Sequence, residues 1–300
     1  MPTRPRVTIG VPVHNNERYL AETLESLLAQ TFTDFELLIC DNASTDGTGA
    51  IARGFAARDR RVRYLPSPRN VGIAGNFNRV VPLAGGEYCR WFAADDLAAP
   101  RSLERCVEVL DRRPEVVLTY PRTRLIDAFG ESLGDYDDRL HVQSESPSER
   151  FRALLARVGL CNAFYGLTRT AVLRRTGLFG DYSGSDEVFQ AELVLYGTFW
   201  EIPEVLFFRR MHSAAASAAT PAGRRALYRP QWTHGTESRE WRHLWGLMRA
   251  VQRAPIGSGE KLRLGVFLLR SVVWNRGRLA RELRAALQHL IRSTRRPAGP

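Results

Sequence analysis

Residues 87–96 read EYCRWFAADD, and the rest of the chain is interpreted from this stretch outward. Residues 88–92 have the aromatic and apolar composition of a strand that is covered on both faces. This strand would run directly into Asp95 and Asp96, and open α/β sheets bind ligands beyond the carboxyl ends of their strands. Adjacent carboxylates repel each other unless a cation or hydroxyl groups satisfy them. The alternative is a solvated turn in which an aspartate caps the loop.

Strand and helix patterns alternate before this stretch, which predicts a parallel sheet wound with crossover helices. We expect strands at residues 7–13, 35–40, 62–65 and 87–94, and helices at 19–28, 48–58 and 74–81. Polar residues with ligand chemistry follow each strand, namely Asn15 and Glu17, then Asp41, then Arg69 and Asn70, then Asp95 and Asp96. Because the carboxyl ends of parallel strands share one edge of a sheet, these side chains should converge on one crevice.

The later part of the chain predicts less regular structure. We expect strands at residues 116–120 and 164–167, and a strand pair at a sheet edge over residues 199–208. Residues 127–148 are polar and rich in turn formers, and we expect them to cover the acceptor side of the crevice.

The composition is that of an ordinary globular protein, with 300 residues, 44% hydrophobic and 25% charged. No run of about 18 apolar residues predicts a membrane span, and the first residues do not lead into a secretory signal. The cysteines show no paired spacing, which predicts free, buried thiols in a reducing compartment. They are Cys40, Cys89, Cys106 and Cys161. We therefore expect a cytoplasmic protein.

The formal net charge of +11 is concentrated at the end of the chain. Residues 221–300 carry 17 Lys/Arg against 4 Asp/Glu, whereas residues 1–220 carry 26 against 28. A cationic tail is typical of binding to nucleic acid or anionic lipid, but also of solvated arginine-rich helices. No nucleic-acid recognition module accompanies it. A Rossmann dehydrogenase is also disfavoured, since no Gly-x-Gly-x-x-Gly follows the first strand.

Four segments, in this order, resemble the motif series of family 2 glycosyltransferases. They read VPVHN at residues 11–15, DNASTDGT at 41–48, NVGIA at 70–74 and ADD at 94–96. The resemblance covers residues 6–215 and implies the GT-A fold, an α/β nucleotide-binding fold with a mainly parallel central sheet flanked by helices. We therefore expect a GT-A domain at residues 1–223 and a basic helical C-terminal extension at residues 224–300.

The resemblance implies a nucleotide-sugar site at the crevice. By it, the backbone at Pro12 and Val13 and the side chain of Asp41 hold the base. Asp95 would meet the ribose or the donor sugar. The remaining residues implied to bind the nucleotide sugar are Asn15, Glu17, Asn70 and Arg210, the last by offsetting phosphate charge together with or in place of Arg209.

The same resemblance implies a divalent cation, Mg²⁺ or Mn²⁺, that bridges the diphosphate. Asp96 would hold it, with His212 as a further ligand; the alternative for His212 is a plain packing role. Many members of the family carry an aspartate two residues before the Asp pair, where this chain has Ala93. Few carboxylates suffice when substrate phosphates supply ligands. A second hypothesis is nevertheless a nucleotide-sugar-binding member of the fold with weak catalysis.

Asp186 lies where, by this resemblance, the enzymes carry a catalytic base at the mouth of a helix, here expected over residues 187–196. An inverting transfer needs a base to remove the proton of the acceptor hydroxyl as its oxygen attacks the anomeric carbon. The alternative is that Asp186 only caps the helix, a position that suits aspartate. Glu187 is the second candidate base.

Helices are expected over residues 224–252 and 260–292. The second has an apolar stripe that can be read in two ways. Either the stripe packs on the sheet domain as a helical cap, or it is an interfacial segment whose arginines meet anionic lipid. The stripe consists of Leu262, Val266, Leu269, Val273, Leu283, Leu287 and Leu290.

The sequence thus predicts an inverting, metal-dependent glycosyltransferase that uses a UDP-, dTDP- or GDP-sugar. Its acceptor would be a hydroxyl of a glycan or a lipid-linked molecule, in bacterial cell-surface polysaccharide or glycoconjugate synthesis. We expect it in the cytoplasm, at the inner face of the membrane if the basic C-terminus makes peripheral contact. A nucleic-acid partner is not expected.

Overall fold

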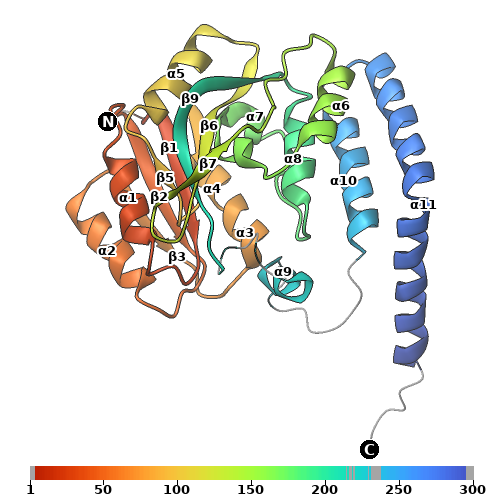
Figure 1. The fold of residues 1–300 in the computed structure, drawn as a ribbon, viewed down its shortest axis with the longest axis horizontal. Coiled ribbons are helices and arrows are strands. Elements are labelled where there is room, and N and C mark those ends of the chain that lie inside the picture. Colours follow the sequence, from red (N-terminus) through yellow and green to blue (C-terminus); the bar gives the residue numbers. More distant parts are fainter. Residues whose placement is uncertain are drawn as a thin grey trace, which may run out of the picture.

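The computed structural model describes residues 4–213, 215, 218, 220–228, 230 and 238–294. In this part of the chain one curved sheet runs through the molecule, with helices on both of its faces (Figure 1). Its strands are β1 (Val7–Val13), β2 (Phe35–Asp41), β3 (Val62–Pro66), β4 (Tyr88–Trp91), β5 (Leu97–Ala98), β6 (Val116–Ile126), β7 (Ser132–Tyr136), β8 (Leu167–Arg169) and β9 (Thr198–Arg210).

Most of the described helices are short, and the longest is the last. They are α1 (Leu20–Leu28), α2 (Thr48–Arg58), α3 (Gly72–Asn78), α4 (Val80–Leu83), α5 (Ser102–Arg112), α6 (Pro147–Arg157), α7 (Thr170–Leu173), α8 (Ser185–Leu193), α9 (Pro221–Tyr228), α10 (Arg239–Arg253) and α11 (Ser258–Thr294). A 3₁₀ helix spans Asn162–Tyr165.

The first half of the sheet is the parallel half that the alternating pattern predicts. Its strand order is β3-β2-β1-β4, and all three pairings are parallel. Every residue of β1 is buried, because β2 and β4 flank it and helices cover both faces. The chain leaves β1 toward β2 on one side and β4 on the other, which creates the crevice where open α/β sheets bind ligands.

The second half of the sheet is mixed and differs from two sequence expectations. β9 is one continuous strand of 13 residues between β6 and β5, whereas we expected a strand pair at the sheet edge. Register shifts in its ladder with β6 absorb the irregularity at Pro121 and keep the strand intact. The strand expected at residues 164–167 is a 3₁₀ helix followed by β8, because Phe164 turns inward onto Trp91 with ring centroids 5.2 Å apart.

Residues 87–96 form β4 and the loop after it, and the strand ends at Trp91 instead of at the expected residue 94. All four residues of β4 are buried. The Trp91 indole N–H donates to the carbonyl of Phe77, 2.9 Å away, and its ring lies among the rings of Phe164, Phe179 and Phe189. This aromatic cluster fixes the end of β4, so the position of the two carboxylates after it follows from core packing.

The cysteines are free, as their spacing predicts. Cys40, Cys89 and Cys106 are buried and Cys161 is half-buried. Burial raises the pKa of the thiols of Cys40 and Cys106 to about 11, so both remain protonated at neutral pH.

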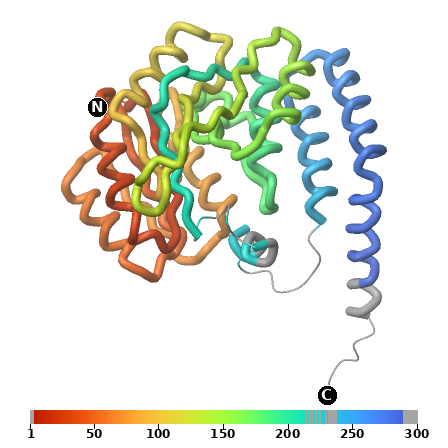
Figure 2. Tube along the Cα trace, viewed as in Figure 1, coloured from red at the N-terminus to blue at the C-terminus, as the bar shows by residue number. Residues whose placement is uncertain are grey.

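The C-terminal helices pack on the sheet domain. Leu247 and Val251 of α10 and Leu264 and Leu268 of α11 join the same hydrophobic core as β4 and β6. An ion pair between Arg253 of α10 and the buried Glu192 of α8, with nitrogen and oxygen 2.7 Å apart, adds a polar contact. α10 and α11 lie side by side along one end of the molecule (Figure 2). The division into two domains at residue 223 stays a prediction.

One expectation for this region is wrong, and one of the two alternatives for the apolar stripe is excluded. The helix expected over residues 224–252 is divided, because α9 ends at Tyr228 and α10 begins at Arg239. The face of α11 that packs inward carries Leu264, Leu268 and Leu279, and the expected stripe faces solvent instead. Both faces are apolar, so periodicity could not choose between them. The side chain of Leu290 lies outside the described residues. None of the described helices combines the length and the apolar character that crossing a bilayer requires.

Gly86, just before β4, gives a test of this packing. A Cβ at this position would lie 2.6 Å from the backbone nitrogen of Thr8 and 2.7 Å from the backbone oxygen of Tyr88, neither of which can move without breaking the sheet. We expect Gly86→Ala to lower the free energy of unfolding by about 3 kcal/mol or more, measured by urea denaturation.

The matched control is Gly265→Ala in α11, where nothing lies within 4 Å of the added Cβ. This change should raise stability by about 0.5–1 kcal/mol, since alanine favours a helix over glycine. Equal effects of the two substitutions would contradict the packing described for β4.

Candidate active site

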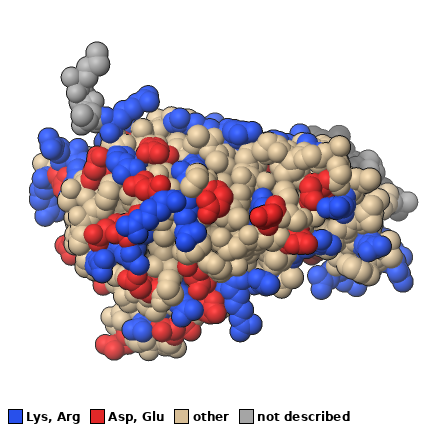
Figure 3. Space-filling model, turned by 90° about the horizontal axis from the view of Figure 1, so that it is seen from above, with Lys and Arg blue, Asp and Glu red and all other residues tan. Residues whose placement is uncertain are grey.

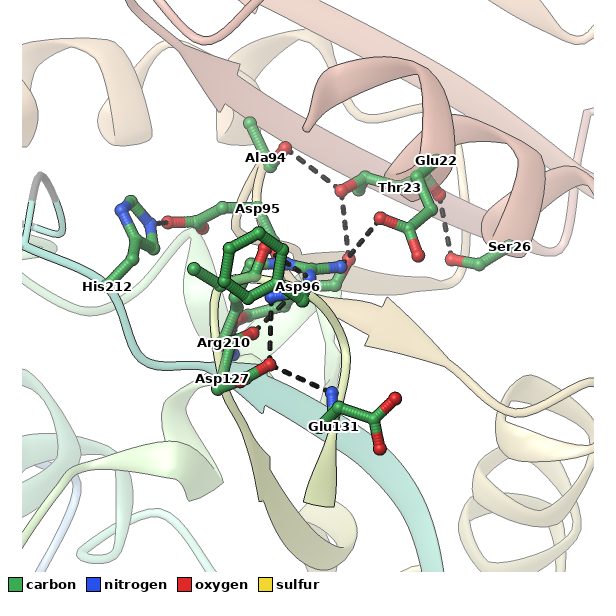
Figure 4. Close-up of polar contacts among 12 residues, drawn as sticks. Glu22, Thr23, Ser26, Ala94, Asp95, Asp96, Asp127, Glu131, Arg210 and His212 are labelled. Atoms are coloured by element: carbon green, nitrogen blue, oxygen red, sulfur yellow. Dashed lines mark hydrogen bonds and ion pairs between the residues drawn. The ribbon is translucent and has the colours of Figure 1, made fainter. Parts of the chain in front are cut away.

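The loop that carries Asp95 and Asp96 is held from two sides (Figure 4). The hydroxyl of Thr23 in α1 lies 2.9 Å from the carbonyl oxygens of both Ala94 and Asp96. From the other side, the backbone N–H of Arg210 donates to Oδ1 of Asp96 at 2.8 Å, and its Nε donates to the carbonyl of Asp95 at 2.9 Å. The end of β9 therefore fixes the position of both carboxylates.

The guanidinium of Arg210 is a buried charge with several partners. Its side chain is 2% exposed and pairs with Glu22 of α1, with nitrogen and oxygen 2.7 Å apart. The same group lies 4.8 Å from the centroid of the Tyr19 ring and 3.4 Å from the carbonyls of Asp127 and Ala128. Since a buried charge is costly unless it is paired, these contacts give Arg210 a structural role at the site.

Asp96 is 3% exposed, and its environment disfavours the charged form. Burial, and after it the neighbouring carboxylate of Asp95, raise the pKa of Asp96 well above its usual value, while the hydrogen bond from the Arg210 N–H opposes this shift. His212 approaches Asp95, not Asp96, with Nε2 2.8 Å from Oδ2 in a hydrogen bond to the carboxylate. The imidazole also packs against the Tyr19 ring, with centroids 4.9 Å apart.

These side chains offer the donor set that a divalent cation would need. The described residues contain no preformed group of three or more His, Cys, Asp or Glu arranged to hold a metal ion. Asp95, Asp96 and His212 nevertheless line one cavity and supply two carboxylates and one imidazole. A partial set of this kind fits a cation that takes its other ligands from substrate phosphates and water.

The loop after β1 is tied to the loop after β2. Asn15 has a positive φ of 48°, and its Oδ1 accepts a hydrogen bond of 2.8 Å from the N–H of Thr45. Oε2 of Glu17 accepts from the N–H of Gly47 at 2.6 Å. Both side chains thus shape the rim of the crevice by satisfying backbone groups of the neighbouring loop.

Asp41 and Asn70 organise the neighbouring wall of the crevice. Oδ1 of Asp41 accepts from the N–H of Ser44 at 2.9 Å and Oδ2 from the hydroxyl of Tyr64 at 2.7 Å. Burial, with the hydrogen bond to Asp41, raises the pKa of Tyr64 to about 12. The amide of Asn42 donates to Oδ1 of Asn70 at 2.9 Å, which fixes the loop before α3.

A cavity of about 700 Å³ lies between these loops, a size typical of ligand sites. It brings together most of the residues that the sequence singled out. Its lining includes Pro12, Val13, Asn15, Glu17, Asn70, Asp95, Asp96, Arg210 and His212. Asp41 is not among the lining residues and contacts its neighbours as described above.

Asp186 lines a second cavity of about 240 Å³ that adjoins the first. The two cavities share five lining residues, which are Ile73, Phe77, Tyr165, Arg209 and Leu227. Asp186 lies in the first turn of α8, and Gly184, with a φ of 92°, is the N-cap. The interpretation of Asp186 as the N-cap is therefore wrong. Glu187 does not line either cavity, and its Oε2 lies 3.3 Å from Nε2 of His243.

Arg209 lines both cavities. Its guanidinium donates to the carbonyl of Leu160 at 2.5 Å and to Oδ1 of Asn162 at 2.6 Å. The backbone N–H of Asn162 in turn donates to Oδ1 of the buried Asp138 at 3.1 Å. The sequence predicts Arg209 and Arg210 as candidate site residues. It does not predict Tyr165, Asn162 or Asp138, because they lie in segments without a recognisable motif.

The comparisons with known proteins identify the family and the fold. Residues 8–178, more than half of the chain, match the family model "Glycosyl transferase family 2". The chain belongs to this family, and the expected family and fold class are confirmed.

Relatives of known sequence include several glycosyltransferases. The chain is 35% identical over 131 residues to the "Putative glycosyltransferase EpsE" of Bacillus subtilis, covering 43% of this chain and 47% of that protein. It is 34% identical over 131 residues to a chondroitin synthase of Escherichia coli, covering 44% of this chain and 19% of the synthase. The chain thus aligns with less than half the length of either relative.

Solved structures share the fold at low sequence identity. TarS of S. aureus, residues 1–349 in complex with UDP-GlcNAc, superposes with a TM-score of 0.63 at 17% identity, covering 85% of this chain and 69% of that one. The mannosyltransferase PcManGT of Pyrobaculum calidifontis, in complex with GDP-Man and Mn²⁺, gives 0.53 at 18% identity, covering 96% and 88%.

Asp138 beneath Arg209 should make stability depend on pH. Burial raises the pKa of Asp138 to about 6, above its value in the unfolded chain, so the folded state holds this proton more tightly. Its contribution is fully present below the unfolded pKa and is lost as pH rises through the folded pKa. We expect Asp138→Asn to gain about 1 kcal/mol relative to the parent protein between pH 5 and pH 7.5, measured by urea denaturation at each pH.

Only the change with pH tests this assignment, because the constant cost of the substituted amide cancels between the two conditions. The control is Glu131→Gln, which removes an exposed carboxylate. Its difference in stability from the parent protein should not change with pH in this way. A difference between Asp138→Asn and the parent that stays constant from pH 5 to pH 7.5 would show that Asp138 titrates normally.

Proposed function

We propose that this protein is an inverting glycosyltransferase that moves a sugar from a nucleoside diphosphate sugar to an acceptor hydroxyl. The observation that carries the proposal is the pair of adjoining cavities with Arg209 and Tyr165 in their shared wall. The larger cavity holds Asp95 and Asp96, and the smaller one holds Asp186. A donor in the first and an acceptor in the second would meet at this shared wall.

The donor is proposed to lie along the crevice from β1 to the Asp95–Asp96 loop. Pro12, Val13 and the Asp41 region would hold the base, and Asp95 would meet the ribose or the sugar. Asn15, Glu17 and Asn70 shape the rim through their hydrogen bonds to backbone groups. The proposed donor is a UDP-, dTDP- or GDP-sugar. Solved structures of the same fold in complex with UDP-GlcNAc and with GDP-Man support the first and the last of these.

The diphosphate of the donor would carry negative charge into the larger cavity, and the chain offers cations to meet it. Arg209 lines both cavities, and its guanidinium donates to one carbonyl and one amide oxygen, whereas the guanidinium of Arg210 is enclosed and paired with Glu22 and with backbone carbonyls. We assign Arg209 to the phosphates and Arg210 to the support of the Asp95–Asp96 loop. A guanidinium suits phosphate because its N–H groups can donate in pairs.

Asp96 and His212, with Asp95 beside them, are proposed to hold Mg²⁺ or Mn²⁺ when the donor binds. The cation would neutralise charge on the departing diphosphate. Asp96 is buried and fixed by the Arg210 N–H, so this carboxylate needs little rearrangement on binding.

Asp186 is the proposed general base. Its carboxylate would accept the proton of the acceptor hydroxyl as that oxygen forms its bond to the anomeric carbon of the sugar. The bond from the anomeric carbon to the diphosphate oxygen breaks at the same time, and the nucleoside diphosphate leaves with that electron pair. Attack from the face opposite the leaving group inverts the anomeric carbon.

The proposed setting is bacterial cell-surface polysaccharide or glycoconjugate synthesis in the cytoplasm, with a glycan or lipid-linked acceptor. The similarity to EpsE and to chondroitin synthase supports it. The second candidate is a nucleotide-sugar-binding member of the family with weak catalysis, favoured by Ala93 in the lining of the larger cavity, where many members carry an aspartate.

A nucleotide panel tests donor class and metal use together. We expect one of UDP, GDP, dTDP and CDP to raise the melting temperature, with a larger rise when Mn²⁺ is present, since ligands that bind the folded state stabilise it. At 100 times its Kd the nucleotide should add about 2.7 kcal/mol of stability. Asp96→Asn should remove the gain from Mn²⁺ and leave most of the gain from nucleotide alone. Equal shifts with all four nucleotides, or none with any, would contradict the assigned site.

Substitution of the proposed base separates the two candidate functions. We expect Asp186→Asn to lower kcat for sugar transfer by about 10²–10⁴-fold and to leave the nucleotide-induced thermal shift unchanged. Glu187→Gln, one residue away but outside both cavities, is the matched control and should retain activity. Retained transfer in Asp186→Asn would exclude Asp186 as the base. A parent protein that binds nucleotide sugar without transfer or hydrolysis would favour the binding-only alternative.

A further inference from the structure

The last helix exposes a row of large apolar side chains. We define the α11 stripe as the exposed apolar residues of α11 that follow a helical repeat. They are Leu262 (70% exposed), Val266 (43%), Leu269 (68%), Val273 (56%), Leu283 (53%) and Leu287 (50%). Spacings of four, three and four residues at the start of the stripe place its members on one face of the helix.

Packing against the rest of the chain does not account for this face. The face that joins the core carries Leu264, Leu268 and Leu279, which are 0%, 4% and 5% exposed. Most surface helices have one apolar face and one polar face, whereas α11 has a second apolar row directed to solvent. Contiguous exposed apolar surface of this kind marks an interaction site.

Exposed tryptophans accompany the stripe. Trp274 of α11 is 72% exposed and Trp245 of the neighbouring α10 is 57% exposed. The guanidinium of Arg249 lies 5.8 Å from the Trp245 ring centroid. Tryptophan is enriched at the boundary between water and hydrocarbon, where its ring can be buried while its N–H stays hydrated.

The charge around the stripe identifies the partner. Residues 238–288, which contain α10 and most of α11, carry 11 Lys/Arg and 3 Asp/Glu. Arg263, Arg270 and Arg281 are exposed and follow a helical repeat of their own beside the stripe. At the α11 end of the molecule basic side chains outnumber acidic ones (Figure 3). A second copy of this chain would bring the same positive charge to the contact, whereas an anionic bilayer brings the opposite charge.

We propose that the α11 stripe and its flanking arginines are a peripheral binding surface for anionic lipid bilayers. The helix would lie in the plane of the interface, with the leucines and valines of the stripe among the upper acyl chains and the arginines at the lipid phosphates. Binding requires both apolar burial and charge, so it should weaken in neutral membranes and at high ionic strength.

Vesicle sedimentation with the full-length protein tests the proposal. We expect binding to vesicles of phosphatidylglycerol and phosphatidylcholine, and little binding to phosphatidylcholine alone. Leu262→Ser combined with Leu269→Ser should weaken binding to the anionic vesicles by about a hundredfold. Arg270→Gln combined with Arg281→Gln should weaken it by about fivefold for each arginine removed.

Leu133→Ser is the matched control, because Leu133 is 58% exposed but lies on β7, away from α11. It should bind vesicles like the parent protein. Since all the substituted side chains are exposed, far-ultraviolet circular dichroism and the melting temperature should be unchanged, which separates loss of binding from loss of folding.

Two kinds of outcome would overturn the proposal, one seen in vesicle binding and one in the oligomeric state measured by light scattering. Vesicle binding that the stripe variant retains, or equal binding to anionic and neutral vesicles, would overturn the proposal. The other result is a parent protein that binds no vesicles and forms a dimer that dissociates in the stripe variant. That result would overturn the proposal in favour of a second copy of the chain. These readouts do not depend on sugar transfer, so failure of the proposed function leaves them interpretable.

Discussion

The site depends on the contacts of one buried residue, Arg210. Arg210 joins the end of β9 to the loop after β4 and to α1, through Asp96, the carbonyl of Asp95 and Glu22. Arg210 is more than 100 residues away in the sequence from each of the other two segments. Removing one partner of a buried charge is strongly destabilising, so the charge locks the three segments into one arrangement. The same contacts place two repelling carboxylates together in the crevice.

The alternating direction of side chains along β9 gives two neighbouring arginines different roles. Successive side chains of a strand point to opposite faces of the sheet, so Arg209 and Arg210 have different contacts, although both line the larger cavity. Arg210 is enclosed under the Asp95–Asp96 loop, and Arg209 reaches the wall shared by the two cavities. The strand thus supplies both the support of the carboxylates and a cation between the larger cavity and Asp186.

Much of the parallel half of the sheet and of the crevice could be predicted, because both arise from local patterns. Alternating strands and helices over residues 7–94 dictate a parallel sheet, and such a sheet brings its carboxyl ends to one edge. The polar residues that follow these strands accordingly line one cavity, apart from Asp41 and Arg69. The mixed half was predicted poorly, since the continuity of β9 comes from its long ladder with β6, a partner some 80 residues away.

The sequence by itself determined the motif order, the family and the chemical character of each loop, because these depend on residue identity and local periodicity. Only the tertiary structure decided which apolar face of α11 is buried, since Leu264 and Leu262 belong to two rows of similar hydrophobicity and packing on α6 and α10 selects one. Likewise, the place of Asp186 beside the larger cavity depends on how α8 packs against the aromatic cluster, a long-range contact that no local pattern contains.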